Sequence, residues 1–173
     1  MQDPHSHTQA SKLSSVLAEH GYLSEREVEL LMEAARQHRW GHRDATAILV
    51  AYQHGLRASE LVALRWNDVD LTTGRLRIRR SKAGGAASAR PISAQEALAL
   101  RRLRDESAPS PRVSVHASAH VFASEHGAPF RANGFERMIA RAGAEAGFGF
   151  VVRARMLRRE LAVEHAAEPS MPQ

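Results

Sequence analysis

The chain has 173 residues, of which 43% are apolar and only 5% aromatic, and it contains no cysteine. The length fits one domain, and a core of Leu, Val, Ala and Ile suits helices. The lack of cysteine excludes a disulfide scaffold and a thiolate metal site. Because no apolar run reaches membrane-spanning length and the polar start lacks the apolar block of a secretory signal, we expect a cytoplasmic protein without a membrane partner.

The charge of the chain favours phosphate-bearing partners. The net charge is +5 and the isoelectric point is near 10.6. Of the 24 lysine and arginine residues, only Lys12 and Lys82 are lysines. An excess of arginine suits phosphate, because the guanidinium fork pairs bidentately with phosphate oxygens and keeps its charge. A GC-rich genome, which favours arginine codons, is the simpler explanation of the ratio taken alone.

The first folded elements are marked by a helix cap and by helical spacing of apolar residues. Residues 1–22 show weak periodicity and are predicted to form a flexible tail. Ser24 and Glu27 have the spacing of a capping box, which indicates a helix start. Three helices are predicted to follow, over residues 25–38, 43–54 and 58–64, of which the second is apolar on most faces and should be buried.

The apolar period then changes from helical to alternating, which predicts a small three-stranded antiparallel sheet. Two strands flank a turn that contains Gly74, a glycine-rich loop follows, and an edge strand comes after the loop. The predicted strands are residues 69–71, 76–79 and 90–92.

The rest of the chain returns to a mostly helical pattern. A second capping box, Ser93 with Glu96, indicates another helix start. The predicted elements are a helix over residues 93–105, a strand over 120–123, a helix over 132–146 and a last helix from about residue 156. We therefore expect a mainly α fold with a small antiparallel sheet (α+β) over residues 23–164, followed by a tail over residues 165–173.

Two pairs of residues suggest a ligand but are interpreted otherwise. His116 and His120 stand four residues apart, but no cysteine and no obvious third ligand accompany them, so neither a metal nor a cofactor is predicted. Trp40 and Trp66 lie outside any basic-aromatic pattern and are interpreted as packing residues. The other histidines, including His54, are interpreted as structural or solvent-exposed.

A helix junction near the middle of the chain carries the first functional motif. Gly55 ends the second predicted helix, since glycine tolerates positive φ, and Arg57 stands two residues later at the start of the next helix. Unpaired backbone N–H groups and the positive end of the helix dipole lie at such a start. An arginine fixed there is well placed to hold a phosphate.

Three motifs follow one another along the chain. The run His54 to Leu61 (His-Gly-Leu-Arg-Ala-Ser-Glu-Leu) precedes a hairpin whose following loop carries Lys82, and the run Arg155 to Arg159 (Arg-Met-Leu-Arg-Arg) comes last. This order resembles the catalytic domain of the tyrosine recombinases, the phage integrase family. The resemblance covers about residues 23–164 and is greatest to short members such as the fimbrial phase-variation recombinases.

The resemblance implies roles for individual residues. In that family two motif arginines hold the scissile phosphate, a tyrosine attacks phosphorus to leave a 3′-phosphotyrosine, and a hairpin lysine protonates the departing 5′ oxygen. It implies phosphate-holding roles for Arg57 and Arg158, the acid role for Lys82 and a supporting role for Glu60. With the basic residues of the hairpin, the predicted DNA-contacting positions are Arg57, Arg77, Arg79, Arg80, Lys82, Arg155, Arg158 and Arg159.

The sequence departs from the family at the last motif and after it. Arg155 and Arg159 stand where the family commonly has histidines, and arginine cannot act as a general acid or base near neutral pH. The family's nucleophilic tyrosine follows this motif, whereas the two tyrosines of this sequence, Tyr22 and the core-like Tyr52, precede it. We therefore expect a C-terminally truncated recombinase that is catalytically impaired by itself.

The leading hypothesis is a nucleoid-associated member of the recombinase family that binds double-stranded DNA without cutting it alone. An intact recombinase could supply a tyrosine in trans, or copies of the chain could associate on DNA. A second hypothesis is a non-catalytic protein that occupies recombination sites and modulates an intact relative. A third is a basic RNA-binding protein, which a comparison of duplex DNA and RNA binding at several salt concentrations would separate from the others.

Overall fold

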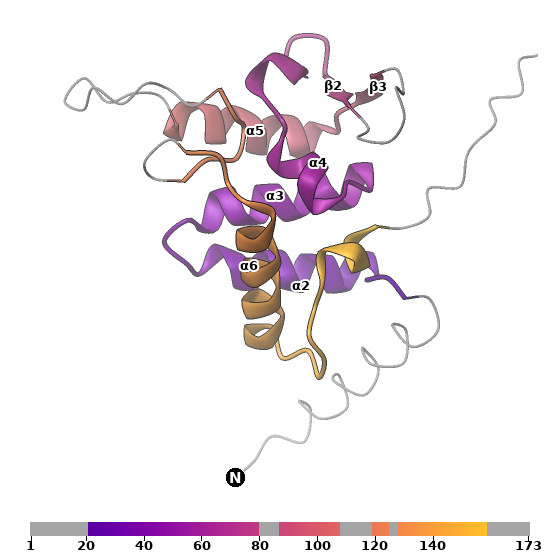
Figure 1. The fold of residues 1–173 in the computed structure, drawn as a ribbon, viewed down its shortest axis with the longest axis vertical. Helices are drawn as coiled ribbons and strands as arrows, with labels where there is room; N and C mark the ends of the chain where they lie inside the picture. The colour runs from indigo at the N-terminus through magenta and orange to yellow at the C-terminus, as the bar shows by residue number, and fades with distance from the viewer. Residues whose placement is uncertain (1–20, 80–86, 108–118, 125–127, 159–173) are drawn as a thin grey trace, which may run out of the picture.

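The computed structural model describes residues 21–79, 87–107, 119–124 and 128–158 (Figure 1). Its helices are α2 (Glu25–Arg36), α3 (Gly41–His54), α4 (Ala58–Val62), α5 (Ala94–Glu106) and α6 (Ala132–Glu145), with 3-10 turns η1 (Trp66–Asp68) and η2 (Ala154–Leu157). Its strands are β1 (Val69–Asp70), β2 (Arg75–Ile78) and β3 (Ser88–Pro91). The prediction of a mainly helical fold with a three-stranded antiparallel sheet is confirmed. None of the described helices has the length and apolar character needed to cross a bilayer.

Helices α2 and α3 lie side by side at the centre of the fold (Figure 1). Helix α2 begins at the predicted capping box, in which the Glu27 N–H donates to Ser24 Oγ and the Ser24 N–H donates to Glu27 Oε2. Leu23 and Val28, on either side of this cap, are buried. Helix α3 is buried over most of its length, and Tyr52 is only 4% exposed, which confirms Tyr52 as a core residue.

The sheet has the order β1-β2-β3, and all neighbouring strands are antiparallel. Strand β2 alternates as predicted, with Leu76 and Ile78 buried and Arg75, Arg77 and Arg79 exposed. One face of the sheet therefore packs on the core, and the other presents a row of arginines. The third strand begins at Ser88, two residues before its predicted start.

The strand predicted over residues 120–123 is wrong. This segment forms isolated bridges with single residues of two loops, Arg65 with His120 and Ala123 with Pro129. Val121 and Phe122 are nevertheless buried. The apolar pattern therefore identified a core segment, but among the described residues no extended strand pairs with it to continue a hydrogen-bonded ladder.

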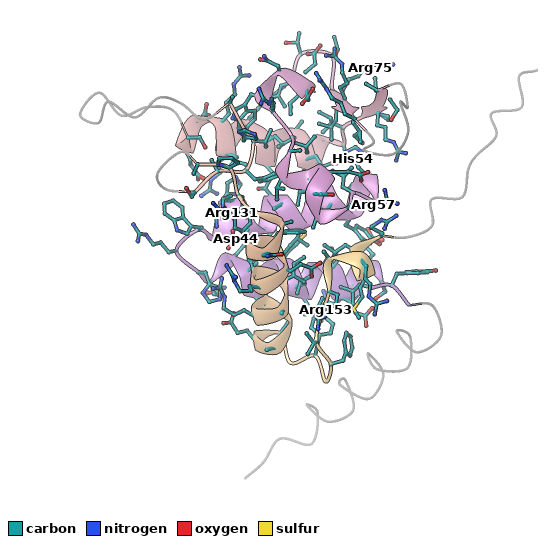
Figure 2. The ribbon with its side chains drawn as sticks, in the orientation of Figure 1. Asp44, His54, Arg57, Arg75, Arg131 and Arg153 are labelled. Atoms are coloured by element: carbon teal, nitrogen blue, oxygen red, sulfur yellow. The ribbon has the colours of Figure 1, made fainter. Side chains whose placement is uncertain are left out.

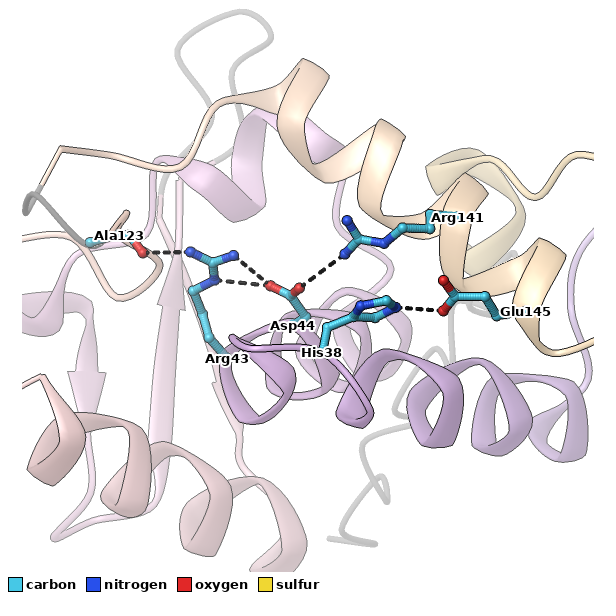
Figure 3. A network of polar contacts seen from close by, with 6 residues as sticks. All are labelled: His38, Arg43, Asp44, Ala123, Arg141 and Glu145. Carbon is cyan, nitrogen blue, oxygen red and sulfur yellow. Dashed lines mark hydrogen bonds and ion pairs between the residues drawn. The ribbon is translucent and has the colours of Figure 1, made fainter.

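Helix α6 crosses the α2–α3 pair, and a charged network joins it to the turn between those helices (Figures 1 and 3). Asp44, which is 2% exposed, accepts a hydrogen bond from Arg43 at 2.7 Å and lies 3.9 Å from the guanidinium of Arg141 on α6. His38 contacts Glu145 near the end of α6. The buried carboxylate is thus paired with arginines from two elements, which fixes α6 against the pair.

The interpretation of Trp40 as a packing residue is wrong. Trp40 lies in the turn before α3 and is 38% exposed, with the guanidinium groups of Arg39 and Arg43 at 5.1 and 5.5 Å from its ring centroid. The tight turn leaves the ring exposed, with two cations close to it. Trp66 does pack against the core, and the Arg104 guanidinium lies 5.7 Å from its ring centroid.

Candidate functional site

The turn between α3 and α4 presents Arg57 (Figure 2). Gly55 ends α3 in the left-handed region, with φ 61°, where a side chain would be strained. Leu56 is buried, and its N–H donates to the carbonyl of Ala51 at 3.0 Å. Arg57 then takes an extended backbone conformation, and its side chain is 44% exposed. The guanidinium therefore projects to solvent from a backbone that is fixed on both sides.

Glu60 holds Arg57 from one turn further along. Its Oε2 accepts a hydrogen bond from the Arg57 N–H at 2.9 Å, and its Oε1 lies 3.6 Å from Arg57 Nη1. The Glu60 side chain is only 7% exposed. The carboxylate thus fixes both the backbone and the side chain of Arg57, which are the contacts that a supporting role requires. The role itself stays a prediction.

Arg158 reaches the same turn from the far end of the described chain. Its Nε donates to the carbonyl oxygen of Gly55 at 3.3 Å, a contact between residues 103 positions apart. The structure therefore brings the first and last motifs together, because Arg158 contacts Gly55, two residues before Arg57. We call Arg57 and Arg158 the arginine pair.

The last motif is held by two other elements. Its described part forms the 3-10 turn η2, and the helix predicted from about residue 156 lies mostly outside the described residues. The Met156 carbonyl accepts from the Leu23 N–H at 2.7 Å, and the Ala154 N–H donates to Glu136 Oε2 on α6 at 3.1 Å. Leu157, next to Arg158, is fully buried. Contacts with the Glu136 side chain of α6 and with the backbone of Leu23, just before the cap of α2, thus set the position from which Arg158 extends.

The other predicted DNA-contacting residues are only partly described. Arg77, Arg79 and Arg155 are exposed. Arg79 Nε lies 3.6 Å from Asp68 Oδ1, and its side chain is 75% exposed. Arg80, Lys82 and Arg159 lie outside the described residues, so the acid role implied for Lys82 stays a prediction.

Sequence reasoning missed one pair of residues beside this turn. His54 Nε2 lies 2.8 Å from Glu96 Oε1, with the two side chains 4% and 2% exposed. The pair joins the end of α3 to the start of α5 and borders a cavity of about 370 Å³ between α3, β3 and α5. The sequence indicates Glu96 as a cap and His54 as structural, but nothing in it indicates that they meet.

Comparison with known proteins decides the family. The family model described as the phage integrase family matches residues 3–171, nearly the whole chain. The chain belongs to the phage integrase family. Its curated relatives include tyrosine recombinases, in agreement with the order of its motifs.

Two of these relatives show how much of their length the chain matches. The type 1 fimbriae regulatory protein FimE of Escherichia coli (strain K12) is 35% identical over 145 residues, which are 84% of this chain and 72% of FimE. The tyrosine recombinase XerC of Xanthomonas axonopodis pv. citri (strain 306) is 32% identical over 130 residues, which are 75% of this chain and 40% of XerC.

Solved structures share the fold of this integrase-family chain. The XerA recombinase is 29% identical with a TM-score of 0.63, and the match covers 79% of this chain and 47% of XerA. The lambda integrase catalytic core has a TM-score of 0.61 at 20% identity, with 79% and 78% covered. At that identity the likeness shows the fold alone.

The buried pair gives this integrase-family domain a predicted acid sensitivity. Burial raises the pKa of Glu96, but hydrogen bonds from His54 and Ser93 and the charge of His54 outweigh burial, and the pKa lies below its ordinary value of 4.5. A lowered carboxyl pKa stabilises the fold above the ordinary value, and the stabilisation is lost as the pH falls through the folded-state pKa.

Glu96→Gln is therefore expected to flatten the acid limb of the stability profile. Urea unfolding from about pH 6 to about pH 3 should show a smaller fall in the free energy of unfolding for the variant than for the wild type. Glu106→Gln, which alters an exposed partner of Arg102, serves as control. Equal acid slopes for Glu96→Gln and the wild type would contradict the assignment.

Among the described residues, no three His, Asp or Glu side chains come together as metal ligands. His120 is described and half-buried, whereas His116 lies outside the described residues.

Proposed function

We propose that this chain binds duplex DNA by holding a backbone phosphate with the arginine pair. The observation that carries this proposal is the 3.3 Å contact between Arg158 Nε and the Gly55 carbonyl, which anchors the last motif at the first. Exposed Arg57 on the turn and exposed Arg158 bonded to the same turn together form a cationic site that suits a dianionic or diester phosphate.

The surroundings of the pair support a phosphate of a nucleic acid rather than a small anion. Exposed Arg75 and Arg77 on β2, with exposed Arg79 just after its end, add positive charge on the hairpin, and the chain carries a net charge of +5. Contacts with several phosphates along a backbone position a protein on a duplex and give affinity without sequence preference. A similar fold occurs in lambda integrase in a structure described as bound to DNA, and that likeness, at 20% identity, concerns the fold alone.

We propose further that the chain acts in DNA recombination and that its 173 residues are impaired in strand cleavage when they act alone. Strand transfer needs a nucleophile that attacks phosphorus while the 5′ oxygen leaves with a proton. Of the two tyrosines, Tyr52 is 4% exposed within α3 and cannot reach a phosphate without unfolding. Arg155 and Arg159 stand at the motif positions where histidines would move protons, and arginine holds its proton at neutral pH.

Two measurements on the 173-residue chain test this function. Fluorescence anisotropy should show binding to duplex DNA that weakens with salt between about 50 and about 200 mM, and weaker binding to an RNA duplex of the same sequence at each salt concentration. A nicked suicide duplex should give no covalent protein–DNA adduct on a denaturing gel. Tighter binding to RNA would favour the RNA-binding alternative, and an adduct would refute the impaired-cleavage proposal.

A further inference from the structure

The dipeptide His54-Gly55 is contacted by three elements that are far apart in the sequence. The His54 carbonyl accepts from Arg90 Nη1 on β3 at 3.3 Å. The His54 side chain contacts Glu96 on α5 at 2.8 Å. The Gly55 carbonyl accepts from Arg158 Nε at 3.3 Å. The position of this dipeptide therefore affects the sheet, helix α5 and the last motif together.

Each oxygen of the buried Glu96 carboxylate has a close polar neighbour. Glu96 Oε1 lies 2.8 Å from His54 Nε2, a close contact between buried polar atoms whose angles are not those of a hydrogen bond. The other oxygen, Oε2, accepts from the Ser93 N–H at 2.9 Å and caps α5. Both side chains are buried, and removing one partner would leave a buried polar group unpaired. The imidazole is therefore fixed to the start of α5.

The direction of the Gly55 carbonyl depends on the residues that hold Gly55 in place. A glycine in the left-handed region, here with φ 61° and ψ 38°, is the most flexible residue of the turn. Its neighbours hold it in place, with Leu56 buried on one side and His54 bound to Glu96 on the other. The direction of the Gly55 carbonyl sets where Arg158 Nε docks. A guanidinium that donates Nε to a carbonyl still has four Nη N–H donors for a phosphate.

We propose that His54 and Glu96 are positioning residues for the arginine pair: their buried 2.8 Å contact fixes the Gly55 turn and, through that turn, the placement of Arg158. The proposal rests on the proposed function, because the arginine pair is taken to bind DNA phosphate. A merely structural role predicts instead that these residues alter folding stability and leave the contribution of Arg158 to DNA affinity unchanged.

A matched pair of amide substitutions separates the two roles. In His54→Gln the side-chain amide stands near the place of Nε2 and still reaches Glu96, whereas in His54→Asn the shorter amide does not. We expect His54→Asn to weaken duplex binding by about the same factor as Arg158→Gln, and to lower the salt slope of log Kd by about one, as for a lost phosphate contact. We expect His54→Gln to bind within about two-fold of the wild type, since its side-chain amide still reaches Glu96.

The double variant His54→Asn/Arg158→Gln decides whether the two residues act together. If His54 acts through Arg158, the double variant should bind no more weakly than Arg158→Gln alone. Circular dichroism melts set a binding temperature at which every variant is folded. If His54→Asn does not fold, Glu96→Gln takes its place in the double-variant comparison with Arg158→Gln, and His54→Gln stays the control. Glu96→Gln removes the charged acceptor and keeps the imidazole.

The possible results have distinct meanings. Additive losses in the double variant, or wild-type affinity in the variant that breaks the pair, would overturn the positioning role and leave the arginine pair standing. Unchanged affinity and salt slope in Arg158→Gln itself would overturn the proposed function and the positioning role with it. Losses in the double variant that match Arg158→Gln alone would support both.

Discussion

Arg57→Gln and Arg158→Gln are each expected to weaken duplex DNA binding by about ten-fold at low salt, because each removes charge-assisted hydrogen bonds to phosphate. Glutamine keeps most of the side-chain length, and at position 158 it still offers an N–H to the Gly55 carbonyl. The loss therefore reports the charge and the fork geometry rather than a collapsed turn. Fluorescence anisotropy at several salt concentrations measures it.

The double variant tests whether the two arginines share one phosphate. With a shared phosphate, the combined loss should be smaller than the product of the single losses, because the remaining arginine already holds a poorly placed anion. Arg102→Gln is the charge-matched control, since Arg102 is exposed on α5 and pairs with Glu106 at 2.8 Å. Strictly multiplicative losses would place Arg57 and Arg158 on different phosphates, and losses equal to that of the control would refute the arginine pair as a specific site.

Local sequence signals predicted the elements of this fold well, because the residues that start and stop them act within one helical turn or one strand. Ser24 with Glu27 and Ser93 with Glu96 form both predicted capping boxes. Gly55 ends α3 in the left-handed conformation that its residue type favours. The alternation in β2 likewise predicted which residues of the strand are buried.

The contacts that form the candidate site could not be predicted from the local sequence pattern. Arg158 meets Gly55, and His54 meets Glu96, only because α3, α5 and η2 converge in the folded chain. The motif order implied that Arg57 and Arg158 act together, but it implied neither the carbonyl that holds Arg158 nor the buried pair behind it. The sequence also failed to predict that Trp40 is exposed, because the hydrophobicity of a residue does not reveal that a tight turn leaves its ring at the surface.

Gly41→Ala is expected to destabilise the fold more than alanine at Gly143 or Gly149, although Gly41 is the first residue of a helix. Helix propensity alone favours alanine by about 1 kcal/mol. A Cβ at position 41, however, would stand 2.1 Å from the backbone oxygen of Arg36, at the end of α2. Backbone cannot move aside as a side-chain tip can, so the turn between α2 and α3 must open. We expect a net loss of about 3 kcal/mol in the free energy of unfolding.

The two other glycines give matched controls for this clash. At Gly149 a Cβ meets nothing within 4 Å, and the φ angle is ordinary, so Gly149→Ala should change the free energy of unfolding by less than about 0.5 kcal/mol. At Gly143 the Cβ would meet buried Val152, at 2.4 Å from its Cγ2 and 2.9 Å from its Cβ, so this clash is with a side chain rather than with backbone. Urea unfolding should therefore rank the losses in the order Gly41, Gly143, Gly149. Asp44, close to Gly41 in the sequence, pairs with Arg141 of α6, so opening this turn should also loosen α6. A wild-type unfolding midpoint for Gly41→Ala would refute the close approach of α2 and α3.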